Sequence, residues 1–283
     1  MNTPEIVLHQ WSISPFCVKV QKILDFKGLP YRVEEYGGFR ALKVKRLSPS
    51  GKLPVLDYAG QRVADSSAIA HMLDALHPSP ALFPASVDPH LVHLLEDWAD
   101  ESLYWFELWF RLFDEAALDR AVAIACAGRP GYERFLFKQG LARYRGTVVA
   151  QGLGRYPRDV ILDNFRAHLS ALAGRLARNP WLAGDAPSLA DIAVSAQLDE
   201  IVRTSEYGRE IDELPALGAW RRRCDFAPDS SAQEVPDTHV APGRASTDHA
   251  SNLHGNAAGS PRLPGAATTF DRRTELTRCK MRK

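Results

Sequence analysis

The chain has 283 residues, of which 45% are hydrophobic, and its 35 Lys and Arg residues nearly balance 34 Asp and Glu residues. This length and apolar content are enough for two ordinary domains, each with its own core. The formal net charge is only +1, so the electrostatic field of the whole protein does not attract nucleic acid or an acidic membrane. We expect neither as a partner.

The first 77 residues switch between short β-prone runs and helical spacing, which is typical of an α/β unit. Ser14 and Pro15 form a helix start, since serine can accept a bond from a free amide and proline at the first helical position loses none. The predicted elements are a strand at 6–11, a helix from 15 to about 27, a strand at 31–36, a short basic helix at 42–47, a β-hairpin at 54–64 and a helix from 66 to about 76.

The proline-rich stretch 78–90 cannot continue a helix or a strand and is predicted to be a linker. Beyond it the alternation typical of strands disappears, so residues 91–224 are predicted to be an all-helical domain. Ser188 and Asp191 are spaced as in a capping box, with Asp in place of the usual Glu. Helices are predicted at 91–113, 132–144, 158–176, 189–203 and 214–223.

The composition changes abruptly after Cys224. Residues 225–283 are rich in small and polar residues and almost lack large apolar ones, so they cannot bury enough surface to offset the entropy of ordering. We predict a disordered tail whose basic end is a solvated surface. An altered reading frame is a further hypothesis for this change.

The four cysteines are scattered and form neither a CxxC pair nor a metal-ligand cluster. This usage favours a reducing compartment over a disulfide framework and gives no metal site. The N-terminus lacks the pattern of a secretory signal, and no run approaches the ~18 apolar residues of a membrane span. We therefore expect a cytoplasmic protein.

The first candidate site lies between Trp11 and Cys17, where a strand runs into a helix N-terminus. Free amides and the helix dipole favour an anion there, including a thiolate. A thiol of pKa ~8.5 is only about 3% ionised at pH 7, and lowering it by about two units makes the thiolate the major form. The Ser14 hydroxyl is the candidate donor to such a thiolate. Taken alone, the pattern also fits a simple helix cap.

Two more candidate sites follow along the chain. Pro54 stands directly before a strand, and a cis bond at this position would turn the Leu53 backbone outward, toward an extended peptide ligand. At the start of the next helix, Ser66 and nearby amides suit a carboxylate, while Asp65 suits an ammonium group. Each pattern alone also fits an ordinary turn or cap.

Together these motifs resemble a known family. A strand leading into SPFC, then GKLPVL, then DSSAI, resembles the glutathione-binding domain of the glutathione transferases, and GDAPSLADIAV resembles the core motif of their helical domain. The resemblance covers roughly residues 6–223. It implies a thioredoxin-like N-terminal domain at 1–77, an all-helical C-terminal domain at 91–224, glutathione as co-substrate without a metal, and a homodimer.

The resemblance also implies roles for particular residues. Leu53 and Pro54 would hold the cysteinyl backbone of glutathione, and Asp65 and Ser66 would hold its γ-glutamyl end. Ser14 would activate the sulfur, as the serine of SPFC-type members such as the tau class does.

Alternatives remain at two points. Ser12 is a less favoured substitute for Ser14, and Cys17 lies one helical turn beyond the position where glutaredoxins and omega-type members carry their nucleophilic cysteine. We therefore expect Cys17 to be a small buried hydrophobe. The stretch 150–159 resembles the metaxin and failed-axon-connections branch, which implies a non-catalytic interaction module as the alternative function.

The predicted helix at 91–113 is rich in aromatic residues. Most of these rings are expected in a core or a dimer interface. Tyr104 is the candidate for an electrophile pocket, because its hydroxyl can orient a substrate or stabilise developing negative charge. We thus predict an enzyme that joins the glutathione thiolate to a small hydrophobic electrophile. A glutathione-dependent isomerase or dehalogenase would use the same site.

Overall fold

The structure is a computed structural model that describes residues 5–226. These residues belong to one compact unit. The tail predicted to be disordered lies outside the described residues from residue 227 onward. Within the described part of the chain, no helix is both long and apolar enough to cross a membrane.

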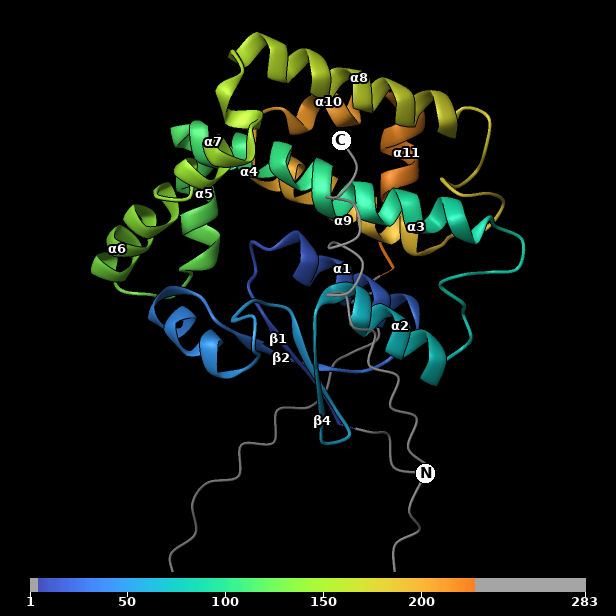
Figure 1. The fold of residues 1–283 in the computed structure, drawn as a ribbon, viewed down its shortest axis with the longest axis horizontal. Coiled ribbons are helices and arrows are strands. Elements are labelled where there is room, and N and C mark those ends of the chain that lie inside the picture. Colours follow the sequence, from blue (N-terminus) through green and yellow to red (C-terminus); the bar gives the residue numbers. More distant parts are fainter. Residues whose placement is uncertain (1–4, 227–283) are drawn as a thin grey trace, which may run out of the picture. The chain divides into compact units, whose positions relative to one another are not determined.

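The N-terminal part is a four-stranded mixed sheet with helices, as the sequence predicts (Figure 1). The strand order is β2-β1-β3-β4, in which β1 and β2 are parallel and the other neighbours are antiparallel. The strands are β1 (Ile6–Gln10), β2 (Arg32–Glu35), β3 (Val55–Tyr58) and β4 (Gln61–Ala64), and the helices are α1 (Pro15–Phe26), the 3-10 helix η1 (Gly38–Arg46) and α2 (Ser66–Leu76).

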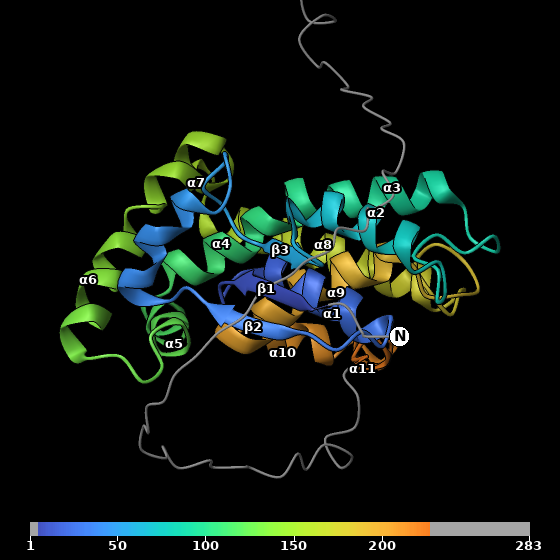
Figure 2. The ribbon, with the colours of Figure 1, turned by 90° about the horizontal axis from the view of Figure 1, so that it is seen from below.

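In the described residues after 88, all the regular elements are helices (Figure 2). The helix predicted at 91–113 is a continuous run from residue 89 to 113 that contains a π-helical turn, η2. The sequence did not predict α5, α7 or α10. The helices are α3 (Pro89–Trp98), η2 (Ala99–Leu103), α4 (Tyr104–Phe113), α5 (Glu115–Ala125), α6 (Gly131–Ala142), α7 (Arg145–Gln151), η3 (Leu153–Arg155), α8 (Arg158–Leu176), α9 (Leu189–Thr204), α10 (Gly208–Asp212) and α11 (Pro215–Arg223).

Helix α9 lies at the centre of the helical part and packs against α1, α3 and α4. In Figure 1, α1 lies between the sheet and α9. The capping box predicted at the start of α9 is confirmed: the Ser188 amide and hydroxyl donate to Asp191 at 3.0 and 2.9 Å. The other end of α9 reaches the loop between β1 and α1, where Arg203 donates to the Ser12 carbonyl.

Candidate functional site

The three candidate motifs leave the sheet at the same edge. In the register of the sheet, His9 of β1 pairs with Val55 of β3, and Val55 pairs with Ala64 of β4. The loop after β1, the residues before β3 and the residues after β4 are therefore neighbours. Since adjacent strands lie about 4.8 Å apart, the chain leaves these strands within about two strand spacings, roughly 10 Å. The fold thus places residues 11–14, 53–54 and 65–66 together.

Ser14 occupies the N-cap position of α1, but its side chain does not cap the helix. The Ser14 amide donates to the Trp11 carbonyl at 2.9 Å, which closes the turn that leads into α1. The Ser14 side chain instead lies close enough to the Cys17 thiol to lower the pKa of that thiol. The hydroxyl at this helix N-terminus is therefore not used on a backbone amide of α1.

Cys17 lies beneath Ser14 and is only 1% exposed. The Trp11 amide donates to its Sγ at 3.4 Å, and burial raises the pKa of the Cys17 thiol to about 12. The interaction with Ser14 lowers this pKa, as a hydroxyl that donates to the sulfur does, but burial outweighs it and the thiol is neutral at pH 7. A buried neutral thiol is not a nucleophile, which agrees with the expectation for Cys17.

The second motif presents backbone groups. The Leu53–Pro54 peptide bond is cis, Pro54 is buried and Leu53 is half-buried. Within residues 5–226, neither the amide nor the carbonyl of Leu53 forms a hydrogen bond. One donor and one acceptor are therefore available to an extended peptide at this edge.

The third motif combines a cap with a free oxygen. Asp65 is the N-cap of α2, with an unusual φ of 83°, and its Oδ1 accepts from the Ser67 and Ala68 amides at 3.1 and 3.0 Å. Its Oδ2 takes no hydrogen bond from the described residues, and Asp65 is exposed. Ser66 is buried beside it at 4% exposure. The helix cap and the binding of an ammonium group can thus use different oxygens of one carboxylate.

A buried lysine supports this third motif, and the sequence analysis did not single it out. Lys19 of α1 is 1% exposed, and its Nζ lies 2.7 Å from carboxylate oxygens of Glu96 and Asp100 and 3.3 Å from the Ser67 hydroxyl. These contacts join α1, the run α3–η2 and the first turn of α2, which Asp65 caps. The only signal in the sequence is a lysine within the apolar stripe of a helix.

Tyr104 begins α4 and lies beside the start of α1, with its ring centroid 4.9 Å from that of Phe16. Burial raises the pKa of the Tyr104 phenol, so it is a neutral hydrogen-bond donor. The other aromatic residues of this run are mainly structural: Phe106, Trp109 and Phe110 are buried in the helical core.

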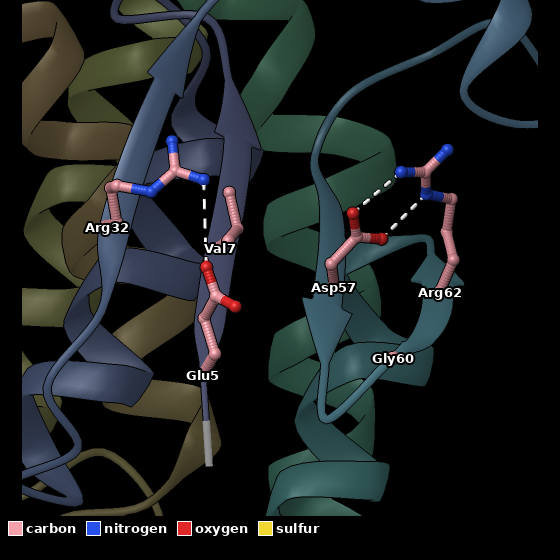
Figure 3. Close-up of a pocket in the computed structure, with 6 residues that line it drawn as sticks. All are labelled: Glu5, Val7, Arg32, Asp57, Gly60 and Arg62. Carbon is pink, nitrogen blue, oxygen red and sulfur yellow. Dashed lines mark hydrogen bonds and ion pairs between the residues drawn. The ribbon is translucent and has the colours of Figure 1, made fainter. Parts of the chain in front are cut away.

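Two cavities are lined by residues outside the three motifs. One, of about 400 Å³, is lined by side chains of the sheet (Figure 3). Its Arg62 forms two bonds of 2.6 Å to Asp57, and its Arg32 lies 3.9 Å from Glu5, so its charges pair with one another. The other, of about 760 Å³, lies between α1, α9 and α11. Among residues 5–226, no group of three or more His, Cys, Asp or Glu is arranged to hold a metal ion.

Comparison with known families matches both halves of the chain. The model described as "Glutathione S-transferase, N-terminal domain" matches residues 13–76, and "Glutathione S-transferase, C-terminal domain" matches residues 115–223. The chain belongs to the glutathione S-transferase superfamily. The first match spans all three candidate motifs, from Ser14 to Ser66, on this transferase fold.

Among relatives in the superfamily, glutathione S-transferase 4 of Zea mays is 26% identical over 225 residues, which are 78% of this chain and 87% of that protein. The isoprene-epoxide–glutathione S-transferase of Rhodococcus sp. (strain AD45) is 28% identical over 203 residues, 67% of this chain and 80% of that protein. Among solved structures, the beta-etherase LigF from Sphingobium sp. strain SYK-6 has a TM-score of 0.57 at 20% identity, covering 79% of this chain and 96% of that chain. This last likeness shows the shared fold.

Proposed function

We propose that the protein is a glutathione transferase that adds the glutathione thiolate to a small hydrophobic electrophile. The observation that carries this proposal is the meeting of three motifs at one edge of the sheet, each with a group that the helices and strands do not use: the Ser14 hydroxyl, the Leu53 backbone and one Asp65 oxygen. These are the groups that a thiolate, an extended peptide and an ammonium need.

Glutathione would lie along this edge in an extended form. Its cysteinyl amide and carbonyl pair with the free backbone groups of Leu53, beside Pro54. Its γ-glutamyl ammonium meets Asp65 Oδ2, and its γ-glutamyl carboxylate meets the Ser66 hydroxyl at the positive end of the α2 dipole. The sulfur then lies at the start of α1, where the Ser14 hydroxyl donates a hydrogen bond to it and the helix dipole favours its negative charge.

In the reaction, the thiol of glutathione loses its proton to solvent and the sulfur forms a bond to an electrophilic carbon. Either a leaving group departs with the displaced electron pair, or an epoxide ring opens and its oxygen takes up a proton. The protein supplies proximity and a lowered thiol pKa.

For the electrophile we propose a small apolar epoxide or activated halide. The Rhodococcus relative is named for an epoxide of isoprene, and the ring contact between Tyr104 and Phe16 offers an apolar wall near the start of α1. The neutral Tyr104 hydroxyl can donate to the oxygen that becomes negative when an epoxide opens. We further expect a cytosolic homodimer, the form implied by the resemblance to this superfamily.

The test measures glutathione binding by calorimetry and conjugation of activated aryl halides and small epoxides. We expect binding and turnover in the wild type and greatly reduced turnover in Ser14→Ala. Ser170→Ala, which removes an exposed serine of α8, is the matched control and should behave as the wild type. A wild type that does not bind glutathione would contradict the proposal and favour a non-catalytic interaction module. Binding with isomerisation or dehalogenation, but no conjugation, would favour the isomerase or dehalogenase.

A further inference from the structure

The peptide of Ser12 is held from two sides by charged side chains that come from distant parts of the chain. Its amide donates to Glu35 Oε1 at 2.9 Å. Its carbonyl accepts from the Arg203 guanidinium of α9. Ser12 is two residues before Ser14 and belongs to the same turn, which the bond from the Ser14 amide to the Trp11 carbonyl closes.

Glu35 is the last residue of β2 and makes contacts with both of its oxygens. While Oε1 accepts from the Ser12 amide, Oε2 accepts from the Gln10 side chain at 3.3 Å. Gln10 is the last residue of β1, directly before the turn. The carboxylate therefore ties the end of the neighbouring strand to the beginning of the turn.

Arg203 is in turn held by a row of charges that runs into the helical core. Its guanidinium lies 2.5 Å from Glu200, which is 1% exposed. Glu200 also lies 3.3 Å from Arg111 of α4, and Arg111 contacts Glu107 one helical turn earlier. Burial raises the pKa of both Glu107 and Glu200, and the positive charges of Arg111 and Arg203 oppose this shift. This row fixes the direction in which Arg203 points.

The position of the Ser12 peptide matters because a hydroxyl that stabilises a thiolate must be placed accurately. Misplacement by about 1 Å is enough to cost on the order of 100-fold in rate. A turn held only by its own backbone would allow such movement, whereas charge-assisted hydrogen bonds on both sides of one peptide restrict it. Arg203 belongs to the helical part of the protein. The helical part therefore helps to fix the turn that carries Ser14 in the N-terminal part.

We propose that Glu35 and Arg203 are positioning residues, which clamp the Ser12 peptide and so determine where the Ser14 hydroxyl meets the sulfur of glutathione. This inference rests on the proposed function. Neither residue touches the ligand in this account, and each acts through the turn.

The test compares Arg203→Met and Glu35→Ala with the wild type. We expect kcat to fall about 10- to 100-fold and the pKa of bound glutathione, followed by thiolate absorbance, to rise toward that of free glutathione. The dissociation constant of glutathione should change less than about threefold, because its backbone contacts are intact. Arg203→Lys keeps a donor to the Ser12 carbonyl and should restore part of kcat.

The matched control is Arg166→Met, which removes an arginine with two bonds of 2.8 Å to Glu210 far along the chain from the turn. It should lower thermal stability about as much as Arg203→Met and leave kcat and the thiolate pKa unchanged. Should Arg203→Met fail to fold, Glu35→Ala decides the question alone.

Normal conjugation by the wild type, together with unchanged kcat and thiolate pKa in the folded variants, would overturn the clamp and leave the proposed function standing. A wild type that neither binds nor conjugates glutathione would overturn both.

Discussion

Replacing Asp191 with alanine should strongly destabilise the helical part of the protein. The Asp191 side chain is fully buried and accepts from four donors: the Leu182 amide at 2.9 Å, the Ser188 amide at 3.0 Å, the Ser188 hydroxyl at 2.9 Å and the Trp220 indole at 2.8 Å. These contacts join the start of α9 to the loop before it and to α11.

The size of the effect follows from what Asp191→Ala leaves behind. Leu182, Ser188 and Trp220 are each 0% exposed, so water cannot replace the lost acceptor. A buried donor without a partner costs about 1–3 kcal/mol. Part of this cost is recovered because the variant no longer buries a carboxylate, whose pKa burial raises in spite of its donors. We expect a net loss of about 3–5 kcal/mol, near the upper end for single substitutions.

Urea unfolding, followed by tryptophan fluorescence and circular dichroism, measures this loss. The control is Asp199→Ala on the same helix, whose carboxylate lies 2.8 Å from both Lys22 and Arg221 but whose side chain is 25% exposed. There we expect a smaller loss, of about 1–2 kcal/mol, because Lys22 keeps its bond to the Cys224 carbonyl and Arg221 keeps its contact with Asp212. Equal losses in Asp191→Ala and Asp199→Ala would refute the reasoning from unpaired buried donors.

Three further substitutions test the site and its charges. Ser14→Ala should lower kcat on the order of 100-fold, as loss of a donor to a developing anion does; steady-state conjugation measures this, and unchanged turnover would remove Ser14 from its role. Asp65→Ala should weaken glutathione binding about 10- to 100-fold through loss of the ammonium contact, and calorimetry showing unaltered affinity would contradict it. Glu107→Gln should stabilise the protein at alkaline pH. Because the folded-state pKa of Glu107 is about 8, above its ordinary 4.5, its contribution to stability is full below pH 4.5 and is lost as the pH rises through 8. The advantage of the variant should therefore grow by a few kcal/mol between pH 5 and pH 9, and urea midpoints that keep a constant difference would argue against it.

Local signals in the sequence were enough to predict the strands, the main caps and the cores of the longer helices. The Ser188–Asp191 box and the hairpin before Asp65 depend on residues within a few positions of one another, and their geometry follows from that spacing. Helix α5 was not predicted, although Asp114 caps it at 2.9 Å and its buried residues follow helical spacing: Ala117, Leu118, Ala121, Val122 and Ala125. The π-helical turn includes Asp100, whose partner Lys19 lies 81 residues away.

At the candidate site, too, local motifs could be predicted from the sequence, whereas contacts between residues far apart in the chain could not. Ser14, Leu53 and Asp65 could be proposed as site residues because each belongs to a short motif at the end of a strand or the start of a helix. The contacts of Ser12 were not found, because Glu35 lies 23 residues away and Arg203 lies 191 residues away. A peptide group carries no residue-type signal. The pairing of β2 with β1 brings Glu35 to it, and the packing of α9 against α1 brings Arg203.

The ionisation of bound glutathione tests the central claim most directly. The thiolate absorbance of the wild-type complex, titrated between pH 5 and pH 10, should give a thiol pKa below about 7, compared with ~8.5 for a free thiol. In Ser14→Ala the same titration should give a value at least about one unit higher. A wild-type complex whose thiol ionises near the free value, or a variant that matches the wild type, would contradict the account.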